Sequence, residues 1–496
     1  MEGSAATDAL RGLHTSCRGV MLVSMFEDRV ADPVRGNEVE LRLSELLSGL
    51  SHALDITEGQ PRGHAERSCL IGMRLGAELG LDDDTRSSIF YALLLKDAGC
   101  SSNAAKIAAL FAADDATVKR TRRLTDSDST WQALAHIVRT AAPGCPPLVR
   151  ARRVGALIRL GRAGASSLVA LRCDRGAAVA RAIGLDETTA RAILELDEHW
   201  DGRGYPTGLY HDQISLAGRL LCLAQTAEVF WRRGGSEAAC GIARRRRGRW
   251  FDPDLVDALL ALEEDDEFWR SIANPDVSLW EPPDRVLIAD EERLDRVARA
   301  FASVVDAKSP YTARHSARVA EIADQVAATL DLSPDSRATL RRAALLHDLG
   351  KLGVSSRILD KPGPLTEPEW EVMRCHPRWS MEILTRVRAF RELARIAALH
   401  HERLDGSGYV AGLTADDLDL PARILAVADV AEALGADRPY RRALDVDEVL
   451  EIMRGDAGRK LDADAFGALE DVLPALRLAD AERSRPRQGS RRRSAS

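Results

Sequence analysis

One nine-residue pattern occurs twice in this chain. DGRGYPTGL begins at residue 201, and DGSGYVAGL begins at residue 405, 204 residues later. Further upstream, His64 and His315 are 251 residues apart, and the same spacing separates Asp97 from Asp348. Repetition over such a distance favours two copies of one domain over a solenoid of short repeats. A chain of 496 residues is long enough for two domains with substantial cores.

Changes in composition predict where the copies begin and end. The segment EPPDR from residue 281 breaks a helical pattern, and DEERLDRVARAF starts another. The basic, serine-rich end RSRPRQGSRRRSAS shows no apolar periodicity. We therefore predict an irregular lead-in at residues 1–40, a first copy at 41–275, a linker at 276–294, a second copy at 295–480 and a disordered tail at 481–496.

The apolar residues are spaced as in helices. Between residues 316 and 330, Val319, Ile322, Val326 and Leu330 recur at steps of three and four. Only 5% of the residues are aromatic, whereas alanine, leucine and arginine are abundant. The expected fold class is all-α, with two tandem helical domains.

The second copy concentrates residues that bind metals. All five histidines after residue 290 belong to this group, and two of them are adjacent, in front of a glycine-rich turn. Imidazoles and carboxylates without a thiolate suit two first-row divalent cations, such as Fe or Mn, better than a structural zinc. Each candidate lies on or beside a predicted helix, as a preorganised site requires. The candidate ligands are His315, His347, Asp348, His376, His400, His401 and Asp429.

Asp348 is the natural bridge between two cations, because a carboxylate offers two oxygens whereas an imidazole nitrogen binds one metal. We expect His315, His347 and Asp429 to complete one metal site. The other metal would take His376, His400 and His401. Two such cations can activate a bridging water for an in-line attack on phosphorus, which makes Asp348 catalytic, and Lys351 can reach a phosphate oxygen as a point charge.

A purely structural explanation exists for each residue alone. A His-Asp dipeptide is common by chance, a buried histidine is usually a hydrogen-bonded core residue, and Asp429 alone fits a salt bridge on a helix. The joint pattern of five histidines and two aspartates favours the metal site.

The second copy resembles the HD-GYP domain, a subgroup of the HD phosphohydrolases. The likeness runs from about residue 311 to 440 and includes YTARHSARVA, LLHDLGKLGV, CHPRWSMEIL, HHERLDGSGY and ARILAVADV. It implies an all-helical HD-type fold and hydrolysis of cyclic di-GMP to pGpG or GMP. It also implies that the seven candidates above are the metal ligands, that Lys351 contacts phosphate, and that the nucleotide pocket is shaped by Arg403, Asp405, Gly406, Gly408 and Tyr409.

Two positions depart from the family pattern. Val410 replaces the proline of the GYP signature, which stiffens a loop and binds no metal, so we expect altered loop geometry. Tyr311 stands where members with three metals carry a glutamate, which favours a site with two metals.

The first copy has lost most of the same residues. Lys96 replaces the histidine of the His-Asp pair, Gln225 matches Asp429, and we align Asp174 with His376. An ammonium group in a cation site repels metal. We therefore expect no metal in a degenerate first copy, which acts as a scaffold or sensor.

Other functions stay open. A related metal phosphohydrolase can act on another nucleotide or phosphoester, and a non-catalytic regulator would bind nucleotide or protein without turnover. The resemblance suggests a diguanylate cyclase domain as partner, and a homodimer is an open alternative. The net charge of −7 gives no case for nucleic acid, and the absence of long apolar stretches predicts a cytoplasmic protein with no membrane partner.

Overall fold

The computed structural model describes residues 41–484, apart from 127–128, 284–285 and 440. The predicted lead-in at 1–40 and residues 485–496 of the predicted tail lie outside the described residues. Within the described residues, all regular elements are helices, joined by turns with a few isolated β-bridges. The predicted all-α class is confirmed.

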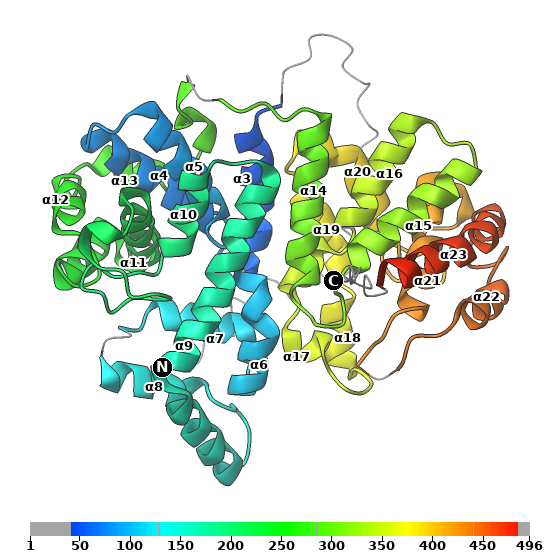
Figure 1. The fold of residues 1–496 in the computed structure, drawn as a ribbon, viewed down its shortest axis with the longest axis horizontal. Helices are drawn as coiled ribbons and strands as arrows, with labels where there is room; N and C mark the ends of the chain where they lie inside the picture. The colour runs from blue at the N-terminus through cyan, green and yellow to red at the C-terminus, as the bar shows by residue number, and fades with distance from the viewer. Residues whose placement is uncertain (1–40, 127–128, 284–285, 440, 485–496) are drawn as a thin grey trace, which may run out of the picture.

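The N-terminal half of the molecule consists of helices of very different lengths (Figure 1). Two of the longest, α9 and α11, each contain glycines with non-helical backbone angles that divide them. The elements are α3 (Leu43–Thr57), α4 (His64–Glu78), α5 (Asp83–Leu95), η1 (Cys100–Asn103), α6 (Ala104–Phe111), α7 (Asp115–Arg123), α8 (Thr130–Thr140), α9 (Pro147–Ile183), α10 (Glu187–Glu195), η2 (His211–Gln213), α11 (Leu216–Arg246), α12 (Pro253–Ala261), α13 (Asp266–Ser271) and η3 (Val277–Leu279).

The C-terminal half carries the candidate metal ligands. Its elements are α14 (Glu291–Asp306), α15 (His315–Thr329), α16 (Pro334–Leu346), η5 (Leu349–Gly353), α17 (Ser356–Leu359), α18 (Glu367–Met373), α19 (His376–Leu384), η6 (Arg388–Phe390), α20 (Arg391–Ala398), η7 (Ala415–Asp417), α21 (Leu420–Leu434), α22 (Val446–Arg454) and α23 (Ala463–Ser484). The segment predicted as a linker, 276–294, includes η3 and the first turn of α14.

Local sequence signals fix the helices that carry the site. Ser333 accepts a hydrogen bond from the backbone of Ser336 and is followed by Pro334, so α16 starts with a cap and a proline in its first turn. Asp419 caps α21 in the same way through the backbone of Ala422. Because these starts are fixed, the ligands that come about three to four turns later, Asp429 and His347, are held in register.

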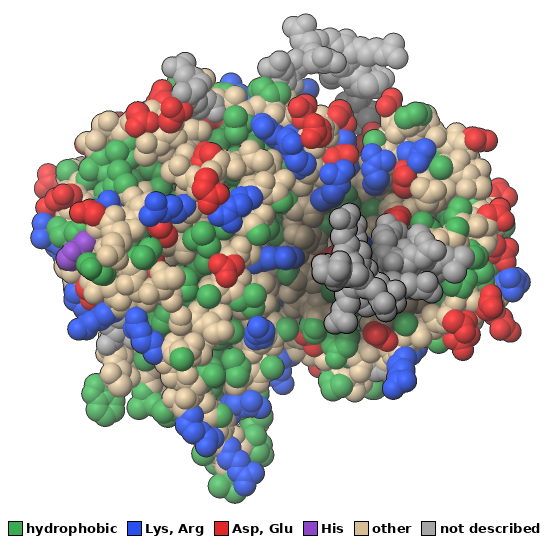
Figure 2. Space-filling view, viewed as in Figure 1, with side chains coloured by type: hydrophobic (Ala, Val, Ile, Leu, Met, Phe, Trp, Pro, Cys, Tyr) green, Lys and Arg blue, Asp and Glu red, His purple; other side chains and the backbone are tan. Residues whose placement is uncertain are grey.

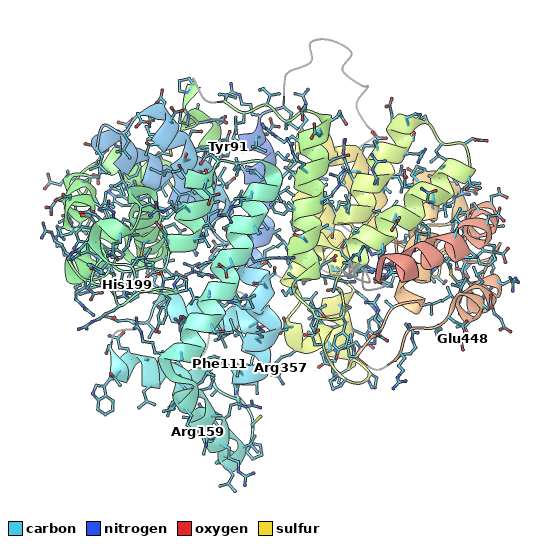
Figure 3. All side chains as sticks on the ribbon, viewed as in Figure 1. Tyr91, Phe111, Arg159, His199, Arg357 and Glu448 are labelled. Atoms are coloured by element: carbon cyan, nitrogen blue, oxygen red, sulfur yellow. The ribbon has the colours of Figure 1, made fainter. Side chains whose placement is uncertain are left out.

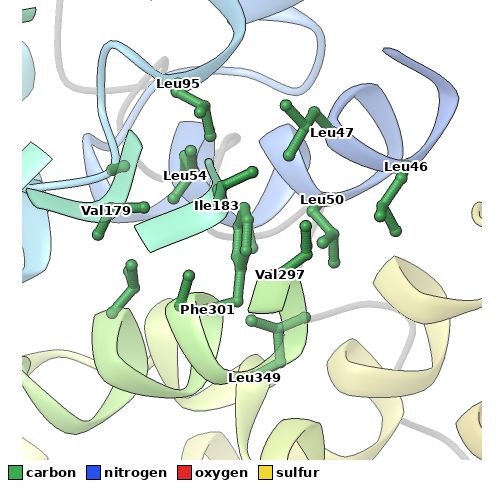
Figure 4. Packing of buried hydrophobic residues seen from close by; sticks show 14 of the residues in the cluster. Leu46, Leu47, Leu50, Leu54, Leu95, Val179, Ile183, Val297, Phe301 and Leu349 are labelled. Carbon is green, nitrogen blue, oxygen red and sulfur yellow. The ribbon is translucent and has the colours of Figure 1, made fainter. Parts of the chain in front are cut away.

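The two halves share one hydrophobic core. Leu50 and Leu54 of α3 and Ile183 of α9 pack with Phe301 of α14 and Leu349 of η5 (Figure 4). Gly49 allows a close approach here, because a Cβ at this position would lie 2.6 Å from Cγ2 of Val387. The N-terminal half therefore packs directly on η5, the short helix that follows Asp348.

A polar contact also crosses between the halves. Asp115 is buried at the start of α7 and accepts a hydrogen bond of 3.1 Å from the backbone nitrogen of Ser356, the first residue of α17. Lys308, buried at the end of α14, donates to the carbonyl oxygen of Leu352 in η5. These contacts fix the C-terminal end of η5 from both sides.

Candidate metal centre

All seven predicted ligands converge between five segments of the C-terminal half. Each lies at a helix end or, in one case, two turns inside a helix. His315 opens α15, His347 follows α16, Asp348 precedes η5, His376 opens α19, His400 and His401 follow α20, and Asp429 lies within α21. Six are buried, and His401 is partly exposed.

Asp348 lies between two groups of imidazoles. Its Oδ2 is 3.3 Å from Nε2 of His315 and 3.4 Å from Nε2 of His347. Its Oδ1 is 3.3 Å from Nε2 of His376 and 3.9 Å from Nε2 of His400. The carboxylate therefore presents one oxygen to each group, as a ligand shared by two cations must.

Two sets of neighbouring donor atoms contain the residues of the predicted division, and a third set, His347, Asp348 and His400, lies across it. His315, His347 and Asp429 bring one ligand atom each to within 4.8 Å of one another. His376, His400 and His401 form a second set within the same limit. Each of these two sets has three donors, and Asp348 adds one oxygen to each, which gives four protein donors around each position.

The ring orientations aim Nε2 of three histidines into the site. Nδ1 of His347 donates to the carbonyl of Ala344 at 2.7 Å, and Nδ1 of His400 donates to the carbonyl of Ala397 at 2.6 Å. His376 makes the same contact with the carbonyl of Met373 at 2.7 Å. Because Nδ1 uses its proton in this contact, Nε2 is the nitrogen that would bind a metal.

Glu432 binds Nδ1 of His315, as backbone carbonyls bind Nδ1 of the other three rings. Its Oε2 contacts Nδ1 of that ring, and both side chains are buried. Sequence reasoning missed Glu432. The available signal was its place three residues after Asp429, on the same face of α21.

Several polar atoms of this site are buried without a hydrogen-bond partner. They are Nε2 of His315, Nε2 of His347 and Oδ1 of Asp348. Leaving such atoms unsatisfied costs about 1–3 kcal/mol each. Their positions and their N/O chemistry fit divalent cations, which would satisfy all three.

The charges of the site shift its pKa values in two directions. Burial alone would lower the pKa of His347, but Asp348 and Asp429 outweigh it and raise that pKa to about 10. At His400, burial and the charge of His347 hold the pKa well below its ordinary value. Without a metal, a proton on the His347 ring thus offsets the negative charge of Asp348 and Asp429. A metal that binds to this ring must displace that proton.

The packing of η5 on α19 fixes Asp348 relative to His376. Ser380 donates to the carbonyl of His347 at 2.7 Å and accepts from the backbone nitrogen of Gly350 at 2.8 Å. A Cβ at Gly350 would lie 2.0 Å from the carbonyl oxygen of His376. Only glycine permits this approach.

Glu402 organises the glycine turn beside the site. This buried carboxylate accepts hydrogen bonds from the backbone nitrogens of Ala411, Gly412 and Leu413. A Cβ at Gly408 would collide with it, at 2.3 Å from Oε2. The loop is thus held by Glu402 although Val410 replaces the proline of the signature.

Two of the residues predicted to bind nucleotide, Tyr409 and Arg403, contact the paired histidines. The ring of Tyr409 is 4.8 Å from the ring of His401, with 38% of the residue exposed. Arg403 donates through Nη1 to the carbonyl of Glu402 at 2.9 Å. Asp405 accepts from Ser407 inside the turn, and Gly406 has a φ of 75°, so these two residues shape the turn itself.

The acidic cluster around Asp97 in the N-terminal half contains cations from the protein. Lys96 contacts Oδ2 of Asp97, and Arg123 donates to Oδ1 of Asp97 at 2.8 Å. Arg123 also contacts Glu58 at 3.0 Å. Glu58, Asp97 and Cys100 bring donor atoms close together. The two basic side chains already neutralise these carboxylates, so the cluster does not need a metal.

Comparison with known proteins places this geometry in a family. The HD domain profile matches residues 164–255 and 299–465, together more than half of the chain. The 3'3'-cGAMP-specific phosphodiesterase 3 of Vibrio cholerae is 43% identical over 438 residues, which cover 88% of this chain and 95% of the relative. The chain belongs to the HD-domain family. Within this family it is a metal-dependent phosphodiesterase of the HD-GYP type.

One further relative matches a shorter part of the chain, and one solved structure matches most of it. The cyclic di-GMP phosphodiesterase response regulator RpfG of Xanthomonas campestris is 40% identical over 182 residues, which cover 36% of this chain and 47% of that protein. A crystal structure of a cyclic GMP-AMP-specific phosphodiesterase of V. cholerae, V-cGAP3, has a TM-score of 0.60 at 38% identity and covers 88% of this chain and 98% of its own.

Proposed function

We propose that this HD-domain protein hydrolyses a cyclic dinucleotide, with 3'3'-cGAMP as its main substrate. The observation that carries this choice is the relative specific for 3'3'-cGAMP, which aligns over 95% of its length. The relative named as a cyclic di-GMP phosphodiesterase aligns over 47% of its length. Cyclic di-GMP, hydrolysed to pGpG or GMP, is the second candidate because the motifs of the catalytic half are shared with these enzymes.

The donor set supports two divalent cations, of which Fe and Mn suit the imidazole and carboxylate ligands best. His315, His347 and Asp429 would hold one and His376, His400 and His401 the other, with Asp348 shared. When bound, such a pair lowers the pKa of a water and offsets charge on the phosphate.

Side chains around the donor set would handle the substrate. The ammonium of Lys351, 2.6 Å from Oδ2 of Asp348, is placed to contact a phosphate oxygen that approaches this carboxylate. The exposed part of the Tyr409 ring offers a face for a nucleobase. Arg403 supports the turn through its contact with the Glu402 carbonyl.

The N-terminal half, residues 41–275, is in our proposal a degenerate copy of the catalytic half. Nδ1 of His64 contacts Glu228, as Nδ1 of His315 contacts Glu432. A Cβ at Gly99 would lie 1.8 Å from the carbonyl of Arg172, as one at Gly350 would meet that of His376. These contacts match Arg172 with His376, and they correct our alignment of Asp174 with that histidine.

The degenerate copy would act as a scaffold rather than a second active site. Lys96 and Arg123 each contact one oxygen of Asp97. In the catalytic half, the two oxygens of Asp348 face two sets of metal donors instead. The turn beginning at Asp201 is held on one side by hydrogen bonds from α9, and its exposed side would contact a protein partner, for which a diguanylate cyclase domain is the first candidate. We also propose that the protein forms a homodimer and is located in the cytoplasm.

The test is turnover by the full chain reconstituted with Mn or Fe. 3'3'-cGAMP, cyclic di-GMP and a mononucleotide phosphoester are compared by chromatography of the products, with Asp348→Ala as the inactive control. We expect the highest kcat/KM with 3'3'-cGAMP and a linear dinucleotide as first product. A preference for cyclic di-GMP would overturn the substrate choice, and turnover of the mononucleotide alone would overturn the substrate class.

A further inference from the structure

A projecting arm of the N-terminal half has no role in the proposed reaction. It consists of α8 and the part of α9 before Gly161, where the backbone is non-helical with a φ of 56°. The tip of the arm extends away from the body of the molecule, below the N-terminal half (Figure 1). The part of α9 after Gly161 returns to the body, where Val179 and Ile183 join the shared core.

The charged side chains of the arm are all basic. From residue 129 to residue 160 the sequence has five arginines and no aspartate or glutamate, although the whole chain has a net charge of −7. Within the described residues, Arg152 and Arg159 form no ion pair and are exposed. Figure 2 shows arginine and apolar side chains at the projecting end and no acidic ones, and Figure 3 places Arg159 there.

Large apolar side chains are exposed on the same arm. Trp131 is 81% exposed and Leu148 is 79% exposed, with Ile158 at 51% and Val149 at 48%. Exposing such side chains together is unfavourable in water and marks an interaction surface. Arginines among them mean that the surface binding this arm must be both apolar and negatively charged.

We propose that this arm binds the surface of an anionic lipid bilayer. Exposed tryptophan, leucine and isoleucine side chains can enter the boundary between headgroups and acyl chains, while the arginines contact lipid phosphates. The rest of the protein is acidic and is repelled by such a surface, so the arm sets the orientation. This proposal departs from our sequence-based expectation of no membrane partner, which considered only spanning segments.

The arm fits a peripheral contact better than a span. By length and composition alone α9 is apolar enough to cross a membrane, with 11% of its apolar window buried. Its break at Gly161 and the burial of Val179 and Ile183 in the core leave only the first part of α9 free to meet lipid. This part also carries arginines that a bilayer interior would exclude.

The test is sedimentation of the full chain with lipid vesicles. Vesicles of phosphatidylglycerol mixed with phosphatidylcholine are compared with vesicles of phosphatidylcholine alone. We expect binding only to the anionic vesicles, and weaker binding as salt is raised, because ions screen the arginines. No binding to anionic vesicles at low salt, or equal binding to both kinds, would overturn the proposal.

Matched variants separate the arm from the rest of the surface. Arg152→Glu with Arg159→Glu should reduce the vesicle partition coefficient by about 20-fold or more, since each arginine near such a surface contributes about fivefold. Arg388→Glu with Arg391→Glu, two exposed arginines of the other half, should leave it unchanged. Equal losses in the two double variants would overturn the role of the arm.

The apolar contribution is tested in the same way. Trp131→Ser with Leu148→Ser should reduce vesicle binding at least tenfold, and Leu279→Ser, at a residue 78% exposed on η3, should not. Light scattering gives the oligomeric state of each protein. If the arm variants dissociate an oligomer and vesicle binding is absent, the arm joins two copies of the chain and the proposal is wrong.

Discussion

Lys351 donates to Oδ2 of Asp348 at 2.6 Å, the same oxygen that lies 3.3 Å from Nε2 of His315. One carboxylate oxygen thus lies between a phosphate-binding candidate and a metal-binding candidate. In the N-terminal half, Lys96 contacts Oδ2 of Asp97 but is fully buried, whereas the Lys351 side chain is 19% exposed. Lys351 can therefore swing towards a substrate, and Lys96 cannot.

Lys351→Met should lower kcat/KM by about 100-fold, because one positioned donor to the reacting phosphate is lost. The metal content should stay unchanged, since this lysine is not among the ligands. Steady-state kinetics and elemental analysis of the same preparation check both parts. Lys361→Met, which removes a lysine paired with Glu369 away from the site, serves as control. Loss of metal from Lys351→Met would show that the lysine supports the ligands instead.

Asp348→Asn should affect activity, whereas Asp97→Asn should affect stability. The first should abolish turnover, because asparagine cannot provide two anionic oxygens to two cations. The second should leave kcat and metal content unchanged but destabilise the protein by about 3–5 kcal/mol, because the buried Lys96 and Arg123 lose their shared carboxylate. Activity assays and denaturant melts distinguish the two. A loss of metal on Asp97→Asn would contradict the assignment of a single metal centre.

Glu432→Gln should weaken metal binding by about 10- to 100-fold while leaving the fold intact, because Glu432 orients the ring of His315. Titration of the metal-free protein with Mn²⁺ measures this change. Glu448→Gln on α22, whose side chain caps that helix at the surface, is the matched control. Equal metal affinities in the two variants would mean that the His315–Glu432 contact does not orient His315 for metal binding.

The buried Lys308 predicts a pH dependence of stability. Burial lowers its pKa from 10.5 to about 8. The unfolded chain therefore binds more protons than the native protein between these values, so the free energy of unfolding gains a contribution as pH rises from about 8 to 10.5. This contribution is absent below pH 8. It reaches at most about 3 kcal/mol above pH 10.5. Denaturant melts of the wild type and Lys308→Met across this range should show the difference between them grow, and a constant difference would contradict the shift.

The parts of the site that depend on residue type and order could be predicted from the sequence. Imidazoles such as His347 and His376 cannot be explained as packing residues when five of them share one half, and periodicity placed each beside a helix. The two-sided role of Asp348 followed from the chemistry of a carboxylate. The predicted helix at 316–330 is observed as His315–Thr329, because local apolar spacing determined it.

Contacts between distant segments could not be predicted. Glu432 and Glu402 act through partners that only the tertiary structure brings close, and glutamates are common on exposed helix faces. In the proposed repeat, the close approach of Gly99 to Arg172 matches this arginine with His376. No linear spacing reveals that match, because the first half contains extra residues before its glycine turn. Arg123, which occupies an oxygen of Asp97, comes from a segment with no counterpart in the motif.

The most direct test of the central claim is anomalous diffraction from crystals of the full chain loaded with Mn²⁺. We predict two peaks on either side of the Asp348 carboxylate, about 3.5–4 Å apart, and none beside Asp97. A single peak that does not contact Asp348, or a peak among Asp97, Glu58 and Cys100, would contradict the account.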